Sequence, residues 1–152
     1  MVELSSPKRK MLKLAKAYLG KKVDFDNQDG PQCADLSAFL IKNATGATIW
    51  GNAIETDKKD NIDIINKSGH KARRISPNEK PQAGDLLVED TGDDIGHVSI
   101  IESVKKDGKV TVYEQNYNGD AETNPKGVEK RTRNTADKDG WGKVEGYLRI
   151  ED

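Results

Sequence analysis

The spacing of hydrophobic residues changes once along this chain, and that change limits the fold more than any other feature. Up to about Thr45, apolar residues recur at helical spacing. From Ala72 onward, short β-rich runs alternate with turn residues. A chain in which helices precede strands is typical of the α+β class, with an antiparallel sheet. We therefore expect residues 1–152 to form a single domain, with N-terminal helices packed on a sheet of about five or six strands.

Capping residues mark the helices of the first half. Ser5-Ser6-Pro7 supplies a serine cap and a first-turn proline, and Gly20 ends that helix. A polar loop over Val23–Pro31 separates it from the second helix. One or two short helices are expected before residue 70. The helices after the first are expected over about Gln32–Asn43, Asn52–Thr56 and Asn61–Lys67.

Five strands are predicted in the second half. Asp107-Gly108 lies between two of them and is a strong signal for a hairpin turn. Asn118–Gly140 is polar and rich in Gly, Asn and Asp, so we expect a long loop there. The strands are expected at Ala72–Ile75, Asp85–Glu89, His97–Val104, Lys109–Glu114 and Gly146–Ile150.

Composition excludes several classes of protein. The net charge is −1, with no dominant basic block, which argues against nucleic acid as the main partner. Lysines are frequent in the first 22 residues, and an exposed helix face explains them. Met1–Gly20 lacks the apolar core of a signal peptide, and no apolar run approaches the ~18 residues of a membrane span. We expect a monomer without membrane insertion, made in the cytoplasm, or a chain from which a leader has been removed.

The only cysteine, Cys33, lies at the predicted start of the second helix. Helix dipoles and unpaired N–H groups favour a thiolate there, although a lone cysteine can equally be a small buried hydrophobic residue. His97 begins a predicted strand, and Glu114 and Asn116 share one face of the neighbouring strand. The predicted hairpin brings that face within reach of the His97 ring. Together these residues offer a nucleophile, a base and orienting groups, as a cysteine hydrolase requires.

Four short motifs occur in order along the chain. They are Gln32-Cys33-x-Asp35-Leu36, Pro81-x-x-Gly84-Asp85, Gly96-His97-Val98 and Glu114-Gln115-Asn116. With these motifs the chain, from about Val23 to Ile150, resembles the CHAP domain, the papain-like amidohydrolase/peptidase of phage endolysins and bacterial autolysins. Two further segments look like landmarks of the same family, Trp50-Gly51-Asn52-Ala53 and Trp141-Gly142 with Gly146-Tyr147-Leu148-Arg149.

The resemblance implies a papain-like fold and a role for each motif residue. Cys33 would be the nucleophile, His97 the general base and acid, and Glu114 the group that orients the imidazole. Asn116 would help to orient the histidine or polarise the scissile carbonyl. Gln32 looks like the family's oxyanion-side glutamine, although the backbone N–H of Cys33 can also fill that role.

The expected activity is hydrolysis of an amide bond in bacterial peptidoglycan. A peptide endopeptidase, as in a phage endolysin, is the leading interpretation, and an N-acetylmuramoyl-L-alanine amidase would use the same residues. A calcium-dependent wall-binding module without turnover and an intracellular thiol isopeptidase remain as alternatives. Trp50, Asn52, Tyr117 and Trp141 are candidates for the substrate groove, and Trp141 fits a core position better.

The loop before Cys33 also carries a candidate metal site. Its oxygen-bearing residues have the spacing of positions 1, 3, 5, 7 and 12 of an EF-hand loop, which suits Ca²⁺. Asp29 replaces the usual glycine at position 6, and an Asp replaces Glu at position 12, so a merely acidic loop is the alternative. Some CHAP domains of staphylococcal-phage type resemble this arrangement, which implies a structural calcium ion. The candidate ligands are Asp24, Asp26, Gln28, Gly30 and Asp35.

Overall fold

The computed structural model of the chain describes residues 6–24, 33–92, 95–115, 127–134 and 143–151. Within them lie three α-helices, one 3₁₀ helix and six strands, so the predicted α+β class is confirmed. The helices are α1 (Pro7–Ala17), α2 (Cys33–Thr45), η2 (Ala53–Glu55) and α3 (Lys59–Lys67). The strands are β1 (Ala72–Ile75), β2 (Leu86–Asp90), β3 (His97–Val104), β4 (Lys109–Gln115), β5 (Val128–Asn134) and β6 (Lys143–Ile150).

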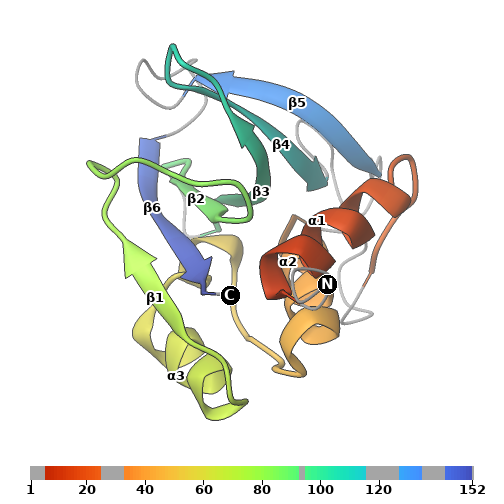
Figure 1. Cartoon of the computed structure of the whole chain (residues 1–152), viewed down its shortest axis with the longest axis vertical. Helices are drawn as coiled ribbons and strands as arrows, with labels where there is room; N and C mark the ends of the chain where they lie inside the picture. The colour runs from red at the N-terminus through yellow and green to blue at the C-terminus, as the bar shows by residue number, and fades with distance from the viewer. Residues whose placement is uncertain (1–5, 25–32, 93–94, 116–126, 135–142, 152) are drawn as a thin grey trace.

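The strands form one antiparallel sheet in the order β1-β6-β2-β3-β4-β5. Figure 1 shows α1 and α2 together on one side of the curved sheet, with α3 beside β1 at the other end. The predicted hairpin joins β3 to β4, with Gly108 at φ +88° in its turn. This hairpin places the start of β3 next to the end of β4, where two of the candidate site residues lie.

Two hydrophobic clusters lie on opposite faces of the sheet, because successive side chains of a strand point to opposite sides. Leu86 and Val88 of β2 join the cluster that α1 and α2 cover, whereas Leu87 joins the cluster on the other face. Helix α2 buries Leu40 and Ile41 completely in the first cluster. Each such side chain contributes about 1.5–3 kcal/mol. This packing holds α2 against β3 and β4 and so fixes where its first residue lies.

Strand β5 was not predicted, and the expectation of a loop throughout Asn118–Gly140 is wrong for Val128–Asn134. The segment VEKRTRN has little of the apolar alternation that marks a strand, since only Val128 and Arg133 are buried. Its seven residues pair with β4 at the edge of the sheet. Backbone pairing and buried charge, neither of which gives a hydrophobic pattern, therefore stabilise this strand.

The remaining boundaries agree with the expected ranges to within a few residues. Strand β6 begins at Lys143 instead of Gly146, and β2 begins one residue after Asp85. Among the described residues, no helix combines the length and the apolar character required to cross a bilayer.

Candidate active site

Cys33 is the first residue of α2, and its free thiol is half-buried. The first N–H groups of a helix have no partner within the helix, so they and the helix dipole stabilise negative charge at this end. The side chain of Cys33 lies beside the His97 ring, close enough to raise the pKa of the imidazole. The structure therefore brings the only thiol of the chain to the start of β3.

His97 is buried, with 2% of its surface exposed, because the chain makes a close approach just before it. Gly96 has a φ of +72°, which favours glycine. A Cβ at this position would lie 2.7 Å from the Cβ of Ile54 in η2 and 2.8 Å from the carbonyl oxygen of Glu89. The backbone N–H of Ile54 donates to the carbonyl of Ile95 at 2.8 Å. Helix η2 and strand β2 thus hold the His97 backbone in place.

Glu114 lies against the ring of His97, with 2.7 Å between Nε2 of His97 and Oε1 of Glu114. The Glu114 side chain is completely buried. With Nε2 directed at Glu114, Nδ1 is the ring nitrogen that remains for Cys33. Each of the three side chains comes from a different element, namely α2, β3 and β4.

The environment of His97 raises its pKa from 6.5 to about 9. Burial by itself would lower the pKa, but hydrogen bonds to Cys33 and Glu114 and the negative charge of both groups outweigh it. The arrangement thus favours a charged imidazolium beside the thiol and the carboxylate, as in the ion pair of a cysteine hydrolase.

Two arginines of β5 also contact Glu114. Nε of Arg131 pairs with its Oε2 at 2.5 Å, and Nη1 of Arg133 lies 3.4 Å from its Oε1. Arg133 also binds Glu89 of β2, with 2.7 Å between Nη2 and Oε2. Arg133, Glu89 and Glu114 are all at least 95% buried. Two guanidinium groups therefore face the side chains of Glu114 and Glu89, and Arg133 contacts both of them.

The sequence did not indicate Glu89, Arg131 or Arg133 as part of the site. A weak signal existed, because Arg131 and Arg133 are two residues apart and would share one face of a strand. No hydrophobic pattern identified that strand. The cluster depends on pairing between residues far apart in the chain, which local spacing does not reveal.

Of the other candidate site residues, the structure describes some and not others. Trp50 is 70% exposed, and its backbone N–H and carbonyl are bound by the side chain of Asn61. Asn52 is also exposed and precedes η2, the helix that contacts Gly96. The substrate groove remains a prediction. The residues Gln32, Asn116, Tyr117 and Trp141 lie outside the described parts of the chain.

The calcium site likewise remains a prediction. Asp24 is exposed and Asp35 is buried in the first turn of α2, whereas Asp26, Gln28 and Gly30 lie outside the described residues. Within the part of the chain that the structure describes, no group of three His, Cys, Asp or Glu side chains could hold a metal ion. Carboxylates at Asp24 and Asp35 fit the oxygen ligands that Ca²⁺ prefers.

The beginning of that loop is anchored beside the site. The Gln115 side chain accepts from the backbone N–H of Val23 and donates to its carbonyl, both at 2.7 Å, and both bonds are buried. Gln115 directly follows Glu114, and the loop ends at Cys33. Both ends of the candidate metal loop are therefore attached next to the cluster of Cys33, His97 and Glu114.

Comparison with known proteins gives the family. The sequence model of the CHAP domain matches residues 23–116 of this chain. That is more than half of its length, so the chain belongs to the CHAP domain family. Among curated proteins, none matches the sequence.

Two solved structures share the fold. The endolysin LysIME-EF1 aligns with a TM-score of 0.77 and 23% identity, covering 95% of this chain and 64% of that one. Ly7917 aligns with a TM-score of 0.65 and 20% identity, covering 95% and 62%. The present chain thus spans less than two thirds of either relative. Together with the family match, these likenesses establish the papain-like CHAP fold that the motifs predicted.

Proposed function

We propose that this chain hydrolyses an amide bond in the peptide part of bacterial peptidoglycan, with Cys33 as the nucleophile. The observation that carries the proposal is the contact of a helix-terminal thiol with a buried histidine, itself held by a buried carboxylate. Membership of the CHAP family supports it, as does the fold shared with a protein that is described as an endolysin.

In the proposed mechanism, Nδ1 of His97 has already taken the proton of the Cys33 thiol in the ion pair, and the Cys33 sulfur attacks the amide carbonyl carbon. The backbone N–H of Cys33 donates to the developing oxyanion. The imidazolium then protonates the leaving amine, and the C–N bond breaks to leave a thioester. His97 next accepts a proton from water, whose oxygen attacks the thioester, and the carboxylic acid and free thiol are released.

Glu114 holds the imidazole in orientation through Nε2 and stabilises its positive charge. Arg131 and Arg133 are proposed to hold the Glu114 side chain in place through their contacts with its two oxygens. Glu89 then balances the second guanidinium. Asn116 and Gln32 keep their proposed roles in orienting the histidine and binding the oxyanion.

Purified peptidoglycan provides the test. The wild-type chain is expected to release soluble fragments, and a folded Cys33→Ala variant is expected to release none. Mass spectrometry of the digest assigns the bond, since a peptide endopeptidase creates a new amino-acid amine, whereas an amidase separates the lactyl group of muramic acid from L-alanine. Substantial digestion by the folded Cys33→Ala variant would exclude Cys33 as the nucleophile.

Thiol labelling separates an enzyme from a wall-binding module without turnover. Iodoacetamide is expected to modify Cys33 rapidly in the wild-type chain and at least tenfold more slowly in His97→Gln, because the imidazolium stabilises the thiolate. An equal, slow rate in both proteins, together with wall binding and no digestion, would favour the binding module.

We also propose that the loop before Cys33 binds a structural calcium ion through Asp24, Asp26, Gln28, Gly30 and Asp35. The anchoring of its two ends beside Glu114 and Cys33 supports an indirect effect on the site. Calcium is expected to raise the melting temperature of the wild-type chain, since a ligand that binds only the native state stabilises it. Asp24→Asn/Asp26→Asn should abolish the rise, and Asp60→Asn on α3 should not. A melting temperature that is the same with calcium and with a chelator would contradict this proposal.

A further inference from the structure

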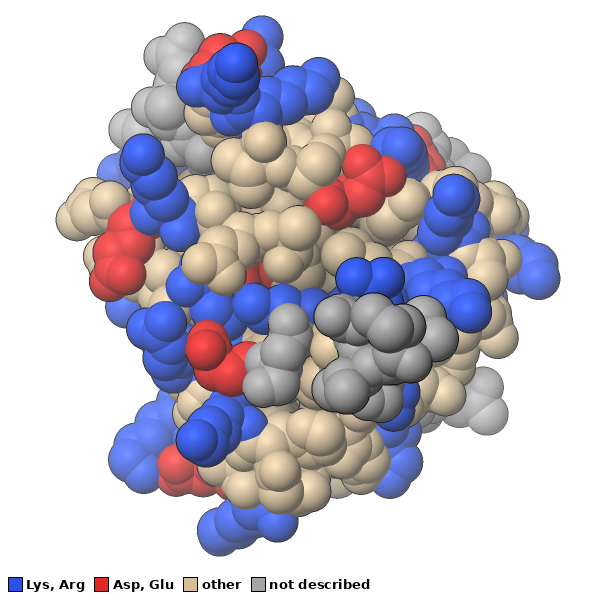
Figure 2. Space-filling model, in the orientation of Figure 1, with Lys and Arg blue, Asp and Glu red and all other residues tan. Residues whose placement is uncertain are grey.

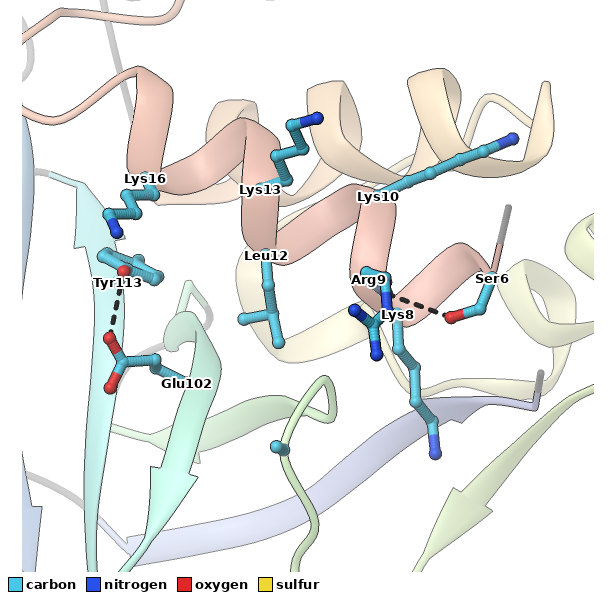
Figure 3. A pocket seen from close by; sticks show the side chains of 10 residues that line it. Ser6, Lys8, Arg9, Lys10, Leu12, Lys13, Lys16, Glu102 and Tyr113 are labelled. Atoms are coloured by element: carbon cyan, nitrogen blue, oxygen red, sulfur yellow. Dashed lines mark hydrogen bonds between the residues drawn. The ribbon is translucent and has the colours of Figure 1, made fainter. Parts of the chain in front are cut away.

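A cavity of about 770 Å³ lies between α1 and the strands β3 and β4, apart from Cys33, His97 and Glu114. Lys8, Leu12 and Lys16 recur at i, i+4 and i+8 and therefore share one face of α1. Figure 3 shows them on the side of α1 toward the strands, with Lys16 directed at Tyr113. Arg9, Lys10 and Lys13 also belong to the lining, and Figure 3 shows Lys10 and Lys13 directed away from the strands.

The positive charge of this cavity is not neutralised by the described part of the chain. None of its five basic side chains forms an ion pair with a described carboxylate. Glu102, the one carboxylate among the described lining residues, pairs with Lys130 at 2.8 Å and accepts from the Tyr113 hydroxyl at 3.0 Å. These contacts hold the pKa of Glu102 below its usual value. On the face shown in Figure 2, basic side chains lie over the side that carries α1 in Figure 1 and over the opposite side as well.

The positive charge at the start of α1 also interacts unfavourably with the dipole of the helix. Its first turn contains Lys8, Arg9 and Lys10 and no acidic residue. Cations near a helix N-terminus are unfavourable by about 0.3–1 kcal/mol each, and like charges four residues apart add to this. Arg9 and Lys13 are such a pair. The basic residues of α1 therefore destabilise the isolated helix, and an anion bound along α1 would offset their mutual repulsion. We call these residues the cation row; they are Lys8, Arg9, Lys10, Lys13 and Lys16.

The length and chemistry of the row favour a repeating anion. Lys8 and Lys16 are about 12 Å apart along the helix axis at 1.5 Å per residue. A single small anion would contact one end of such a row. Four of the five cations are lysines, which act as point charges and bind phosphate without the two-pronged geometry that arginine offers a carboxylate. A flexible chain of phosphodiester groups matches this pattern.

Two other anionic partners fit less well. Binding of single-stranded nucleic acid relies on aromatic rings that stack on the bases, and Tyr113 is only 2% exposed. Membrane association requires a free apolar helix face, whereas Met11 and Ala15 of α1 are completely buried in the core.

We propose that the basic cavity along α1 binds a phosphodiester-linked polyol chain of the bacterial wall, and so holds the hydrolase on its substrate. The inference rests on the proposed function, because a wall hydrolase meets such polymers next to the peptide that it cuts. The site is separate from Cys33 and His97, so binding and cleavage are measured independently.

Binding is measured on Cys33→Ala protein by calorimetry with soluble poly(glycerol phosphate). Arg9→Gln/Lys16→Gln is expected to weaken binding about tenfold, since each exposed cation contributes about 0.2–1 kcal/mol. Lys105→Gln/Lys106→Gln, in the exposed β3–β4 turn, changes the net charge equally and should leave the affinity within twofold. Walls stripped of phosphate polymers with hydrofluoric acid should retain much less protein than untreated walls.

Three outcomes would overturn the proposal. They are equal weakening by the two double variants, equal retention on stripped walls, and tighter binding of a single-stranded oligonucleotide with the same number of phosphates. Cleavage of a phosphate-free wall peptide by the protein that retains Cys33 is measured alongside. If cleavage occurs and the polymer does not bind, only the cavity inference fails; if cleavage is absent, the proposed function fails whatever the polymer does.

Discussion

Replacement of Arg133 by methionine tests the buried charge cluster behind Glu114. The change removes the guanidinium that lies 2.7 Å from Glu89 and 3.4 Å from Glu114, in surroundings where Arg133 is 2% exposed. Removing one partner of a buried ion pair typically costs about 3–5 kcal/mol, because the other charge stays buried. For a chain of this size, each kcal/mol lowers the melting temperature by about 2–4 °C. Arg133→Met should therefore melt about 6–20 °C lower than the wild-type chain.

A second substitution separates lost pairing from lost packing. In Glu89→Leu/Arg133→Met both charges are gone, and replacing a whole buried pair by apolar groups is often nearly neutral. The double variant should recover most of the stability that Arg133→Met loses, which a double-mutant cycle by urea unfolding would measure. If Arg133→Met is within about 1 kcal/mol of the wild-type chain, or the double variant is no more stable than Arg133→Met, the reasoning is refuted.

Arg149 provides a matched control. Its guanidinium binds both carboxylate oxygens of Asp85, at 2.9 and 2.8 Å, in an equally buried pair at the other end of β2. Arg149→Met should lower the stability by a similar amount and leave the His97 pKa unchanged in an NMR titration. Arg133→Met should shift that pKa, because its guanidinium contacts the carboxylate that binds His97. A shift of the same size in both variants would show a general structural effect.

Three further outcomes follow from the geometry around His97. Glu114→Gln should lower the His97 pKa from about 9 toward 6.5 in an NMR titration and reduce kcat by about 10²–10⁴-fold; an unchanged pKa would contradict the contact. Because the folded pKa is raised, the stabilisation by His97 is complete below its unfolded pKa of 6.5 and disappears as the pH rises through about 9, a loss of about 3 kcal/mol. Urea unfolding at about pH 6 and about pH 10 should show that loss, and His97→Gln should lack it. Gly96→Ala should cost at least about 1 kcal/mol more than Gly92→Ala, since both have positive φ but only Gly96 would clash with its surroundings; equal melting temperatures would argue against the close approach.

Most of the fold could be predicted because local patterns carry it. The apolar stripe of α2 and the short apolar run of β2 reflect their burial in the core, and each is visible within a dozen residues. Asp107-Gly108 fixed the β3–β4 hairpin for the same reason, since the turn chemistry is local. Strand β5 escaped prediction because its partners are β4 and buried carboxylates, and only one of its residues is a buried hydrophobic residue.

The residues of the candidate site were likewise predictable only in part. By itself, the sequence determined the α+β class, the helix that begins at Cys33, and the strand positions of His97 and Glu114, because these depend on short-range spacing. Only the tertiary structure decided that Arg133 joins Glu89, 44 positions away, to Glu114. This contact joins β2 and β5, which are not neighbours in the sheet. No periodicity in the sequence predicts such contacts, because they depend on where β5 lies in the sheet.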